Sequence, residues 1–85
     1  MNVYVIAQSY ELGYGVEIDT YPIVFKEKQD AQKKLQELFK EDLEMDEFDV
    51  NEEYLEIDQD DNSYNIYNND SSNWSKASIR TLQLQ

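Results

Sequence analysis

The chain contains no cysteine and no histidine. Disulfides, thiolate nucleophiles, the usual zinc sites, iron–sulfur ligation and imidazole acid–base catalysis are therefore excluded. Small secreted domains usually carry disulfides, so the lack of cysteine favours a reducing compartment. The apolar run over residues 3–7 has no basic region before it and is too short for a signal peptide, and no segment approaches the roughly 20 apolar residues of a membrane span. We therefore expect a cytoplasmic protein that does not insert into membranes.

Glycine and proline are also scarce, with two glycines and one proline. Gly13 and Gly15 separate residues 3–9 from residues 15–25, two segments rich in β-branched and aromatic side chains. Because glycine readily takes positive φ, these segments are expected to form a β-hairpin. Pro22 cannot donate a ladder hydrogen bond, so the second strand should bend there or lie at a sheet edge.

The alternation of the second strand predicts its faces. Val16 and Ile18 are expected to point inward, and Glu17 and Asp19 outward, since successive side chains of a strand lie on opposite faces.

One helix is expected over residues 27–43, "EKQDAQKKLQELFKEDL". Its apolar side chains recur at helical spacing and form a single stripe: Ala31, Leu35, Leu38, Phe39 and Leu43. Three acids at the C-terminal end oppose the helix dipole, so the helix should fray or stop there: Glu41, Asp42 and Glu44.

Three further strands are expected after the helix, over residues 54–58, 63–68 and 77–85. Between helix and strands lies an acidic connection in which Phe48 and Val50 are the candidate anchors. The sequence therefore predicts one acidic α+β domain over residues 1–85, a small antiparallel sheet of about five strands in the order β-β-α-β-β-β with one amphipathic helix packed on one face.

The net charge of −12 is unevenly distributed. Residues 1–40 hold six acids and five bases, residues 41–70 hold thirteen acids and no base, and residues 71–85 hold two bases and no acid. The imbalance therefore belongs to the middle third of the chain. Such a segment repels nucleic acid and anionic membrane, and attracts cations or basic protein surfaces.

Two interpretations of this segment stay open. A solvated surface that keeps a small domain soluble needs a net charge of only about 2–8 in magnitude, and does not require the bases to be absent. Carboxylates on one face of a strand lie about 6.7 Å apart, a distance of the same order as the charge spacing of duplex DNA, so they could imitate phosphates. In this second interpretation ten acids meet Lys and Arg of a partner: Glu44, Asp46, Glu47, Asp49, Glu52, Glu53, Glu56, Asp58, Asp60 and Asp61. Tyr54 and Tyr67 are expected to add apolar contact.

Calcium binding is the weaker alternative for part of this segment. Asp58, Asp60 and Asn62 have the D-x-D-x-N spacing that begins an EF-hand loop. Ser63 stands where that loop needs glycine, and Asn69 stands where a bidentate glutamate should close the ligand shell. A turn rich in Asp and Asn explains the same residues, so neither a metal nor another cofactor is expected.

Catalysis is not expected either. Nothing singles out two carboxylates in an apolar pocket, and no nucleophile elbow, P-loop or dinucleotide-binding motif occurs.

In size, charge and expected α+β character, the chain is similar to the small acidic inhibitors that phages and mobile elements direct against host DNA enzymes. That class includes DNA mimics among the anti-CRISPR, anti-restriction and uracil-glycosylase-inhibitor proteins. The resemblance covers no alignable motif and transfers no residues. It implies an inhibitor that blocks the DNA or RNA site of a basic nucleic-acid-binding protein, such as a nuclease of a bacterial defence system, and that binds no nucleic acid itself. The alternative is a non-enzymatic cytoplasmic protein-interaction domain of unknown role, whose acidic surface serves solubility.

Overall fold

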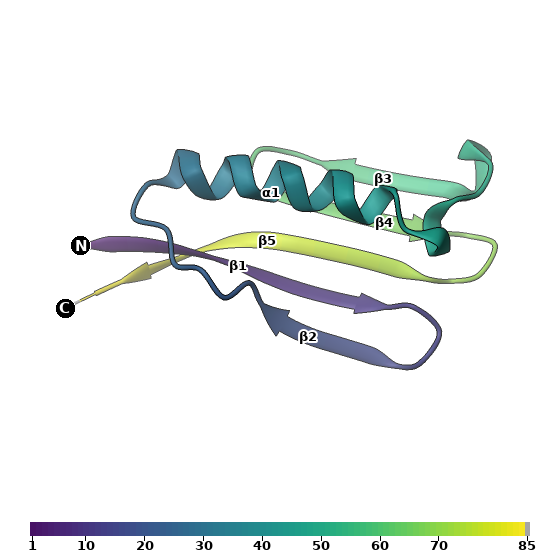
Figure 1. The fold of residues 1–85 in the computed structure, drawn as a ribbon, viewed down its shortest axis with the longest axis horizontal. Coiled ribbons are helices and arrows are strands. Elements are labelled where there is room, and N and C mark those ends of the chain that lie inside the picture. The colour runs from purple at the N-terminus through teal and green to yellow at the C-terminus, as the bar shows by residue number, and fades with distance from the viewer. Residues whose placement is uncertain (85) are drawn as a thin grey trace.

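Five antiparallel strands and one long helix make up the fold in a computed structural model, which describes residues 1–84 (Figure 1). In chain order the elements are β1 (Asn2–Glu11), β2 (Val16–Thr20), α1 (Lys28–Leu43), β3 (Leu55–Gln59), β4 (Ser63–Asn68) and β5 (Trp74–Gln83). The strands lie in the order β2-β1-β5-β4-β3. The α+β class and the expected order of elements are confirmed.

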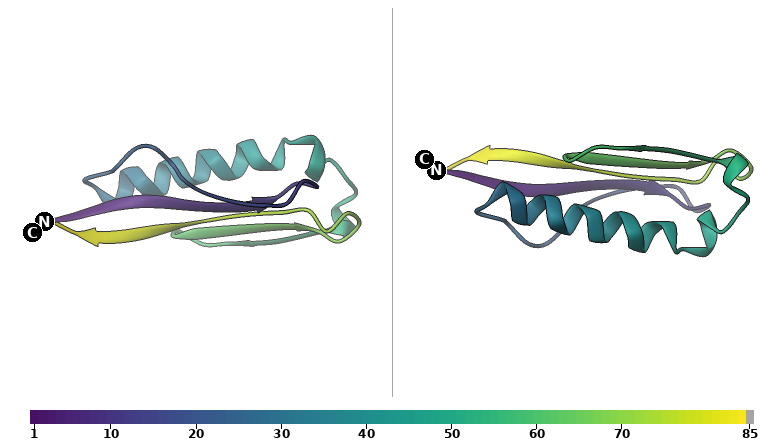
Figure 2. Two further views of the ribbon diagram at one scale, coloured as in Figure 1. Left: turned by 90° about the horizontal axis from the view of Figure 1, so that it is seen from below. Right: turned by 90° about the horizontal axis from the view of Figure 1, so that it is seen from above.

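β5 is longer at its start than the sequence predicts. It begins at Trp74 rather than at residue 77, because its pairing with β1 continues without interruption from Asn2↔Gln83 to Glu11↔Trp74. Gln85, the expected last residue of this strand, lies outside the described residues. The long β1–β5 pairing brings the two ends of the chain to the same end of the molecule (Figure 2).

The helix covers one face of the sheet and leaves the other bare (Figure 2). We call these the helix face and the open face. On the helix face, Leu35, Leu38 and Phe39 of α1 join the same buried cluster as Ile6 and Ile66 of the sheet. Burying such a side chain contributes about 1.5–3 kcal/mol, so the apolar stripe of α1 accounts for its docking. No helix within residues 1–84 is long and apolar enough to cross a membrane.

The expected orientation of β2 is wrong. Val16 and Ile18 are 60% and 83% exposed, and lie on the open face. Glu17 and Asp19 lie instead on the helix face, where Glu17 Oε2 accepts a 2.7 Å hydrogen bond from the Tyr10 hydroxyl. The helix packs over β1, β5 and β4 rather than over β2, so neither face of β2 is covered and its alternation carries no information about burial.

The acidic connection between α1 and β3 is held by one aromatic side chain and one amide. Phe48, in the first of two 3₁₀ turns (Asp46–Phe48 and Glu52–Tyr54), is 2% exposed, which confirms it as an anchor. The buried Asn68 amide donates a 2.8 Å hydrogen bond to the carbonyl of Glu47 and accepts one of 2.9 Å from the backbone N–H of Asp70. The connection is therefore fixed to the end of β4.

We predict that Phe48→Ala destabilises the protein by about 3–4 kcal/mol, because it removes a large buried side chain and leaves a cavity. Phe48→Leu, which keeps much of the apolar volume, should cost less than about 1.5 kcal/mol. Urea unfolding of both variants measures these losses. A loss below about 1 kcal/mol for Phe48→Ala would show that the connection is held in some other way.

Candidate protein-binding edge

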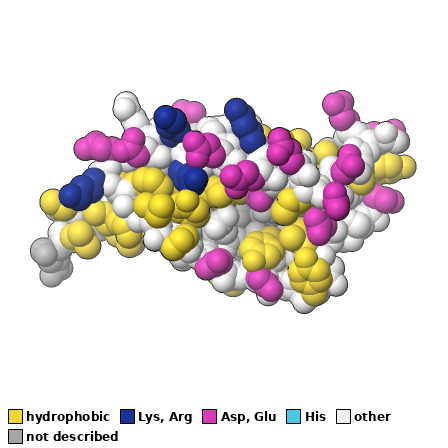
Figure 3. All heavy atoms as spheres, in the orientation of Figure 1, with side chains coloured by type: hydrophobic (Ala, Val, Ile, Leu, Met, Phe, Trp, Pro, Cys, Tyr) yellow, Lys and Arg dark blue, Asp and Glu magenta, His cyan; other side chains and the backbone are white. Residues whose placement is uncertain are grey.

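The acids singled out by the sequence lie along one long side of the molecule and around one of its ends. We call this set the acidic edge: Glu44, Asp46, Glu47, Asp49, Glu52, Glu53, Glu56, Asp58, Asp60 and Asp61. All of these side chains are exposed except that of Glu47, which is half-buried. On the face seen in Figure 3, Asp and Glu side chains gather at the end of the molecule where α1 ends, and no Lys or Arg side chain is visible there.

The structure divides the acidic edge into three parts. The six acids from Glu44 to Glu53 lie in the C-cap of α1 and the connection that Phe48 and Asn68 anchor. Glu56 and Asp58 lie in β3, the outer strand of the sheet, and Asp60 and Asp61 lie in the turn beyond it. Since a strand rises about 3.3 Å per residue, β3 separates the first group from the turn by roughly 17 Å. The acids therefore form a ridge and not a compact cluster.

Glu56 and Asp58 point to the open face. Their cross-strand partners in β4 are Tyr67 and Asn65, whereas Ile57 between them pairs with the buried Ile66 on the helix face. Both carboxylates are exposed on a strand whose five residues are at most half-buried. Glu56 and Asp58 therefore share one face of the sheet.

Asp60 has a structural role in the β3–β4 turn. Its Oδ1 accepts a 2.7 Å hydrogen bond from the backbone N–H of Asn62 and a 3.2 Å bond from the Ser63 hydroxyl. The Asn62 N–H, together with Ser63, holds the pKa of Asp60 below its ordinary value. This geometry is that of an Asx turn, which supports the turn interpretation of the D-x-D-x-N sequence. Within residues 1–84, no group of three or more acids converges in a way that would hold a metal ion.

The open face itself carries positive as well as negative charge. Lys76 and Arg80 of β5 lie on it, and an open hollow of about 640 Å³ is lined by these two bases together with Asp58, Asp60, the apolar Ile18 and mostly small side chains of β1, β4 and β5. β4 lies between β5 and β3, so these two strands are about 9.6 Å apart across the sheet. In the described part of the chain, no ion pair joins the bases of β5 to the acids of β3. The middle of this face is thus nearly balanced in charge, and the excess negative charge lies at its β3 side.

The aromatic side chains around the acidic edge have different environments. Tyr54, directly before β3, is 39% exposed, and Tyr67 is half-buried on the open face beside Trp74. Tyr64 belongs to the core, where its ring lies 5.2 Å from that of Phe39. The two tyrosines expected to contact a partner are therefore partly accessible, whereas Tyr64 is a core residue.

Asp42 has a structural role that was not predicted from the sequence. Instead of pointing to solvent at the end of α1, its carboxylate reaches the sheet and accepts hydrogen bonds of 2.5 Å from the Tyr64 hydroxyl and 2.8 Å from the Ser75 hydroxyl. The sequence does indicate this role, because Asp42 lies seven residues after Leu35 and therefore on the apolar stripe of the helix, which faces the sheet. Burial and the adjacent Asp42 carboxylate raise the pKa of Tyr64 far above its ordinary value.

The carboxylates of the acidic edge have no basic partners within residues 1–84. The one ion pair in this part of the chain joins Lys34 Nζ to Glu37 Oε2 at 3.1 Å, on the exposed surface of α1. The bases of α1 thus leave the acids of the connection and of β3 uncompensated.

No protein-family model, no curated protein and no solved structure matches this chain significantly. The fold and the placement of these side chains are therefore the basis for assigning a function.

We predict that Tyr64 makes stability fall at alkaline pH. The unfolded chain loses this phenolic proton near pH 10 while the folded chain retains it, so the contribution is present below about pH 10 and is lost as the pH rises. Tyr64→Phe should cost about 1–3 kcal/mol near neutral pH, since it removes a hydrogen bond to a charged group, and should flatten the alkaline decline. Urea unfolding at about pH 7 and about pH 10.5 measures both effects. Tyr54→Phe is the control and should alter neither; an unchanged alkaline slope in Tyr64→Phe would contradict the prediction.

Proposed function

We propose that this protein is a small acidic inhibitor that binds a basic nucleic-acid-binding protein and blocks its DNA or RNA site by charge mimicry, as anti-CRISPR and anti-restriction proteins do. The partner is a protein with a Lys- and Arg-lined channel, such as a nuclease of a bacterial defence system. The acidic edge is the contact surface. Neither catalysis nor a cofactor is part of this proposal.

The observation that carries the proposal is the exposure of unpaired carboxylates in a fixed arrangement. Like charges held side by side cost stability, and a flexible tail would provide solubility at lower cost. Here the acids are instead fixed by β3 and by the buried anchors Phe48 and Asn68. A ridge of charge on a fixed backbone suits a basic cleft, because attraction raises the association rate and little backbone order has to be imposed on binding.

The size and shape of the molecule are compatible with this role. Its principal extents are 45 × 23 × 15 Å, so it is narrow enough to lie with one long side in a channel built for a nucleic acid strand. Tyr54, directly before β3, adds apolar contact area next to the acids. Charge alone would give fast but weak association, and aromatic contact would slow dissociation.

The first test is recovery of a partner. Tagged protein is used to capture proteins from bacterial lysate, with and without excess duplex DNA. We expect one nucleic-acid-binding protein to be captured and then displaced by DNA. Capture of a partner that is indifferent to DNA, or of none, would leave the acidic surface as a device for solubility.

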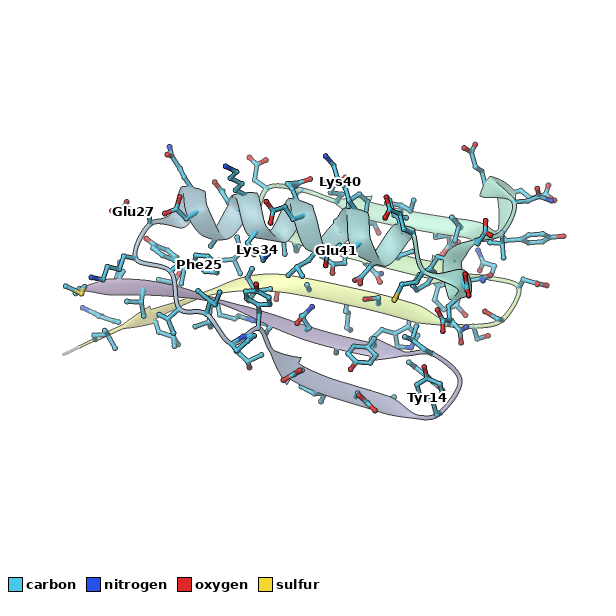
Figure 4. The ribbon with its side chains drawn as sticks, viewed as in Figure 1. Tyr14, Phe25, Glu27, Lys34, Lys40 and Glu41 are labelled. Carbon is cyan, nitrogen blue, oxygen red and sulfur yellow. The ribbon has the colours of Figure 1, made fainter. Side chains whose placement is uncertain are left out.

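Reversal of two charges tests the surface. Glu56→Lys with Asp58→Lys should weaken binding of the captured partner by about a hundredfold or more, because attractive contacts become repulsive. Asp60 is kept, because its reversal would disturb the β3–β4 turn. The matched control is Glu27→Lys with Glu41→Lys, which makes the same change in net charge next to α1 and within it (Figure 4). Equal losses in both pairs would show that only the net charge matters.

Ionic strength provides a further prediction. Because the contacting charges are exposed in the free protein, raising the salt from about 0.05 M to about 0.5 M should lower the affinity steeply, mainly through slower association. Surface plasmon resonance with the captured partner separates the two rates. An affinity independent of salt would assign recognition to the tyrosines and not to the acids.

A further inference from the structure

The sheet has two free edges, at β2 and at β3. An outer strand exposes the backbone N–H and C=O groups that its inner neighbour does not use, and an extended peptide can pair with them. Which residues these are follows from the hydrogen-bond pattern of an antiparallel pair, in which hydrogen-bonded and non-hydrogen-bonded residue pairs alternate.

On β3 the pattern is fixed by two bonds that flank the strand. Asn69 N–H donates to the carbonyl of Tyr54 at 2.7 Å, and Asp60 N–H donates to the carbonyl of Ser63 at 3.0 Å. In the register Asp58↔Asn65, the hydrogen-bonded residues of the strand are therefore the even-numbered ones. The backbone groups of Leu55, Ile57 and Gln59 point away from β4, toward the free edge.

The side chains of β3 then define what could pair there. Glu56 and Asp58 project to the open face, while Leu55, Ile57 and Gln59 project to the helix face, where Ile57 is 46% exposed. An added strand would bond to the backbone of Leu55, Ile57 and Gln59. Its side chains beside Glu56 and Asp58 would lie in the closer, non-hydrogen-bonded pairs, where opposite charges are favourable.

β2 has the same alternation of acidic and apolar side chains, but its acids are already engaged. Tyr21 N–H donates to the carbonyl of Ile6, so in this register the backbone groups of Val16, Ile18 and Thr20 point outward. Glu17 accepts the Tyr10 hydroxyl bond, and Asp19 accepts a 2.8 Å bond from the Thr20 N–H. Both edges repel a second copy of themselves, but the carboxylates of β3 are free to bind a basic strand.

Resting on the proposed function, we infer that the partner contributes an extended segment of alternating basic and apolar residues, which adds to the free edge of β3 as a sixth strand. Its Lys or Arg side chains lie on the open face beside Glu56 and Asp58, and its apolar side chains lie on the helix face beside Leu55 and Ile57. The backbone bonds give affinity, and the alternation gives register and specificity.

Amide hydrogen exchange on the unaltered protein tests this directly. The probe is a short synthetic peptide in which lysine and valine alternate, KVKVKVK, and the control is the same composition in blocks, KKKKVVV. With saturating alternating peptide, exchange of the Leu55, Ile57 and Gln59 amides should slow by about tenfold or more. Binding that leaves these three amides unprotected, or that protects Val16, Ile18 and Thr20 instead, would overturn the inference. Equal protection by the block peptide would also overturn it, because alternation would then have no role.

A proline variant provides a second test. Ile57→Pro removes one outward N–H without breaking a bond to β4, a position at which an edge strand tolerates proline. It should weaken alternating-peptide binding by about tenfold relative to Ile57→Ala, which keeps the N–H. Ile18→Pro makes the equivalent change on β2 and should leave binding unchanged. Equal binding by Ile57→Pro and Ile57→Ala contradicts strand addition; where circular dichroism shows that Ile57→Pro is unfolded, amide exchange decides.

These outcomes are distinguishable from failure of the proposed function. If a captured nucleic-acid-binding protein is displaced by DNA but leaves the Leu55, Ile57 and Gln59 amides unprotected, charge mimicry stands and strand addition is wrong. If the alternating peptide protects these amides but no nucleic-acid-binding protein is captured, the edge is a strand-addition site of a protein with another role.

Discussion

The arrangement of this molecule depends on holding an acidic, base-free segment against its own repulsion. Thirteen acids in residues 41–70 favour expansion of the chain, and the segment remains folded because a few buried groups oppose that tendency. Phe48 inserts its ring into the core, and the Asn68 amide joins the connection to the end of β4. Both groups act at the same end of the sheet. Without them the acids between α1 and β3 would lie in a mobile loop, and the surface they present would have no fixed shape.

Hydrogen bonds also accommodate an acid where the helix meets the sheet. An acid within the apolar stripe of α1 would ordinarily oppose docking, but Asp42 finds two hydroxyl donors, those of Tyr64 and Ser75. A carboxylate that accepts two hydrogen bonds is tolerated at a partly buried position, whereas an unpartnered one is not. Because Ser75 and Tyr64 belong to neighbouring strands, this contact also fixes the position of the helix along the sheet. The excess of acid is thus used inside the fold as well as on its surface.

Periodicity predicts most of the helices and strands, but the local sequence does not show which strands the helix covers. The stripe of α1 and the alternation of β4 are visible because those elements are buried on one face. β2 misleads for the opposite reason, since α1 covers β1, β5 and β4 and leaves β2 outside the core. The acids of the candidate site are conspicuous in the sequence because bases are absent around them. That they follow the outer strand β3 depends on strand order, a long-range property that no local pattern encodes.

Because β2 and β3 are the two outer strands, their charges affect both self-association and partner binding. Exposed outer strands invite aggregation, and acids placed on both β2 and β3 oppose pairing between copies of the chain. Repulsion between like strands is at the same time attraction for a strand of opposite charge, so one feature both prevents self-association and selects a partner. What separates the two edges is the state of their carboxylates. Those of β2 are hydrogen-bonded to Tyr10 and Thr20 and would have to be released, whereas Glu56 and Asp58 would meet a basic strand at no such cost. The asymmetry therefore favours β3 as the recognition edge, even though β2 exposes more apolar surface.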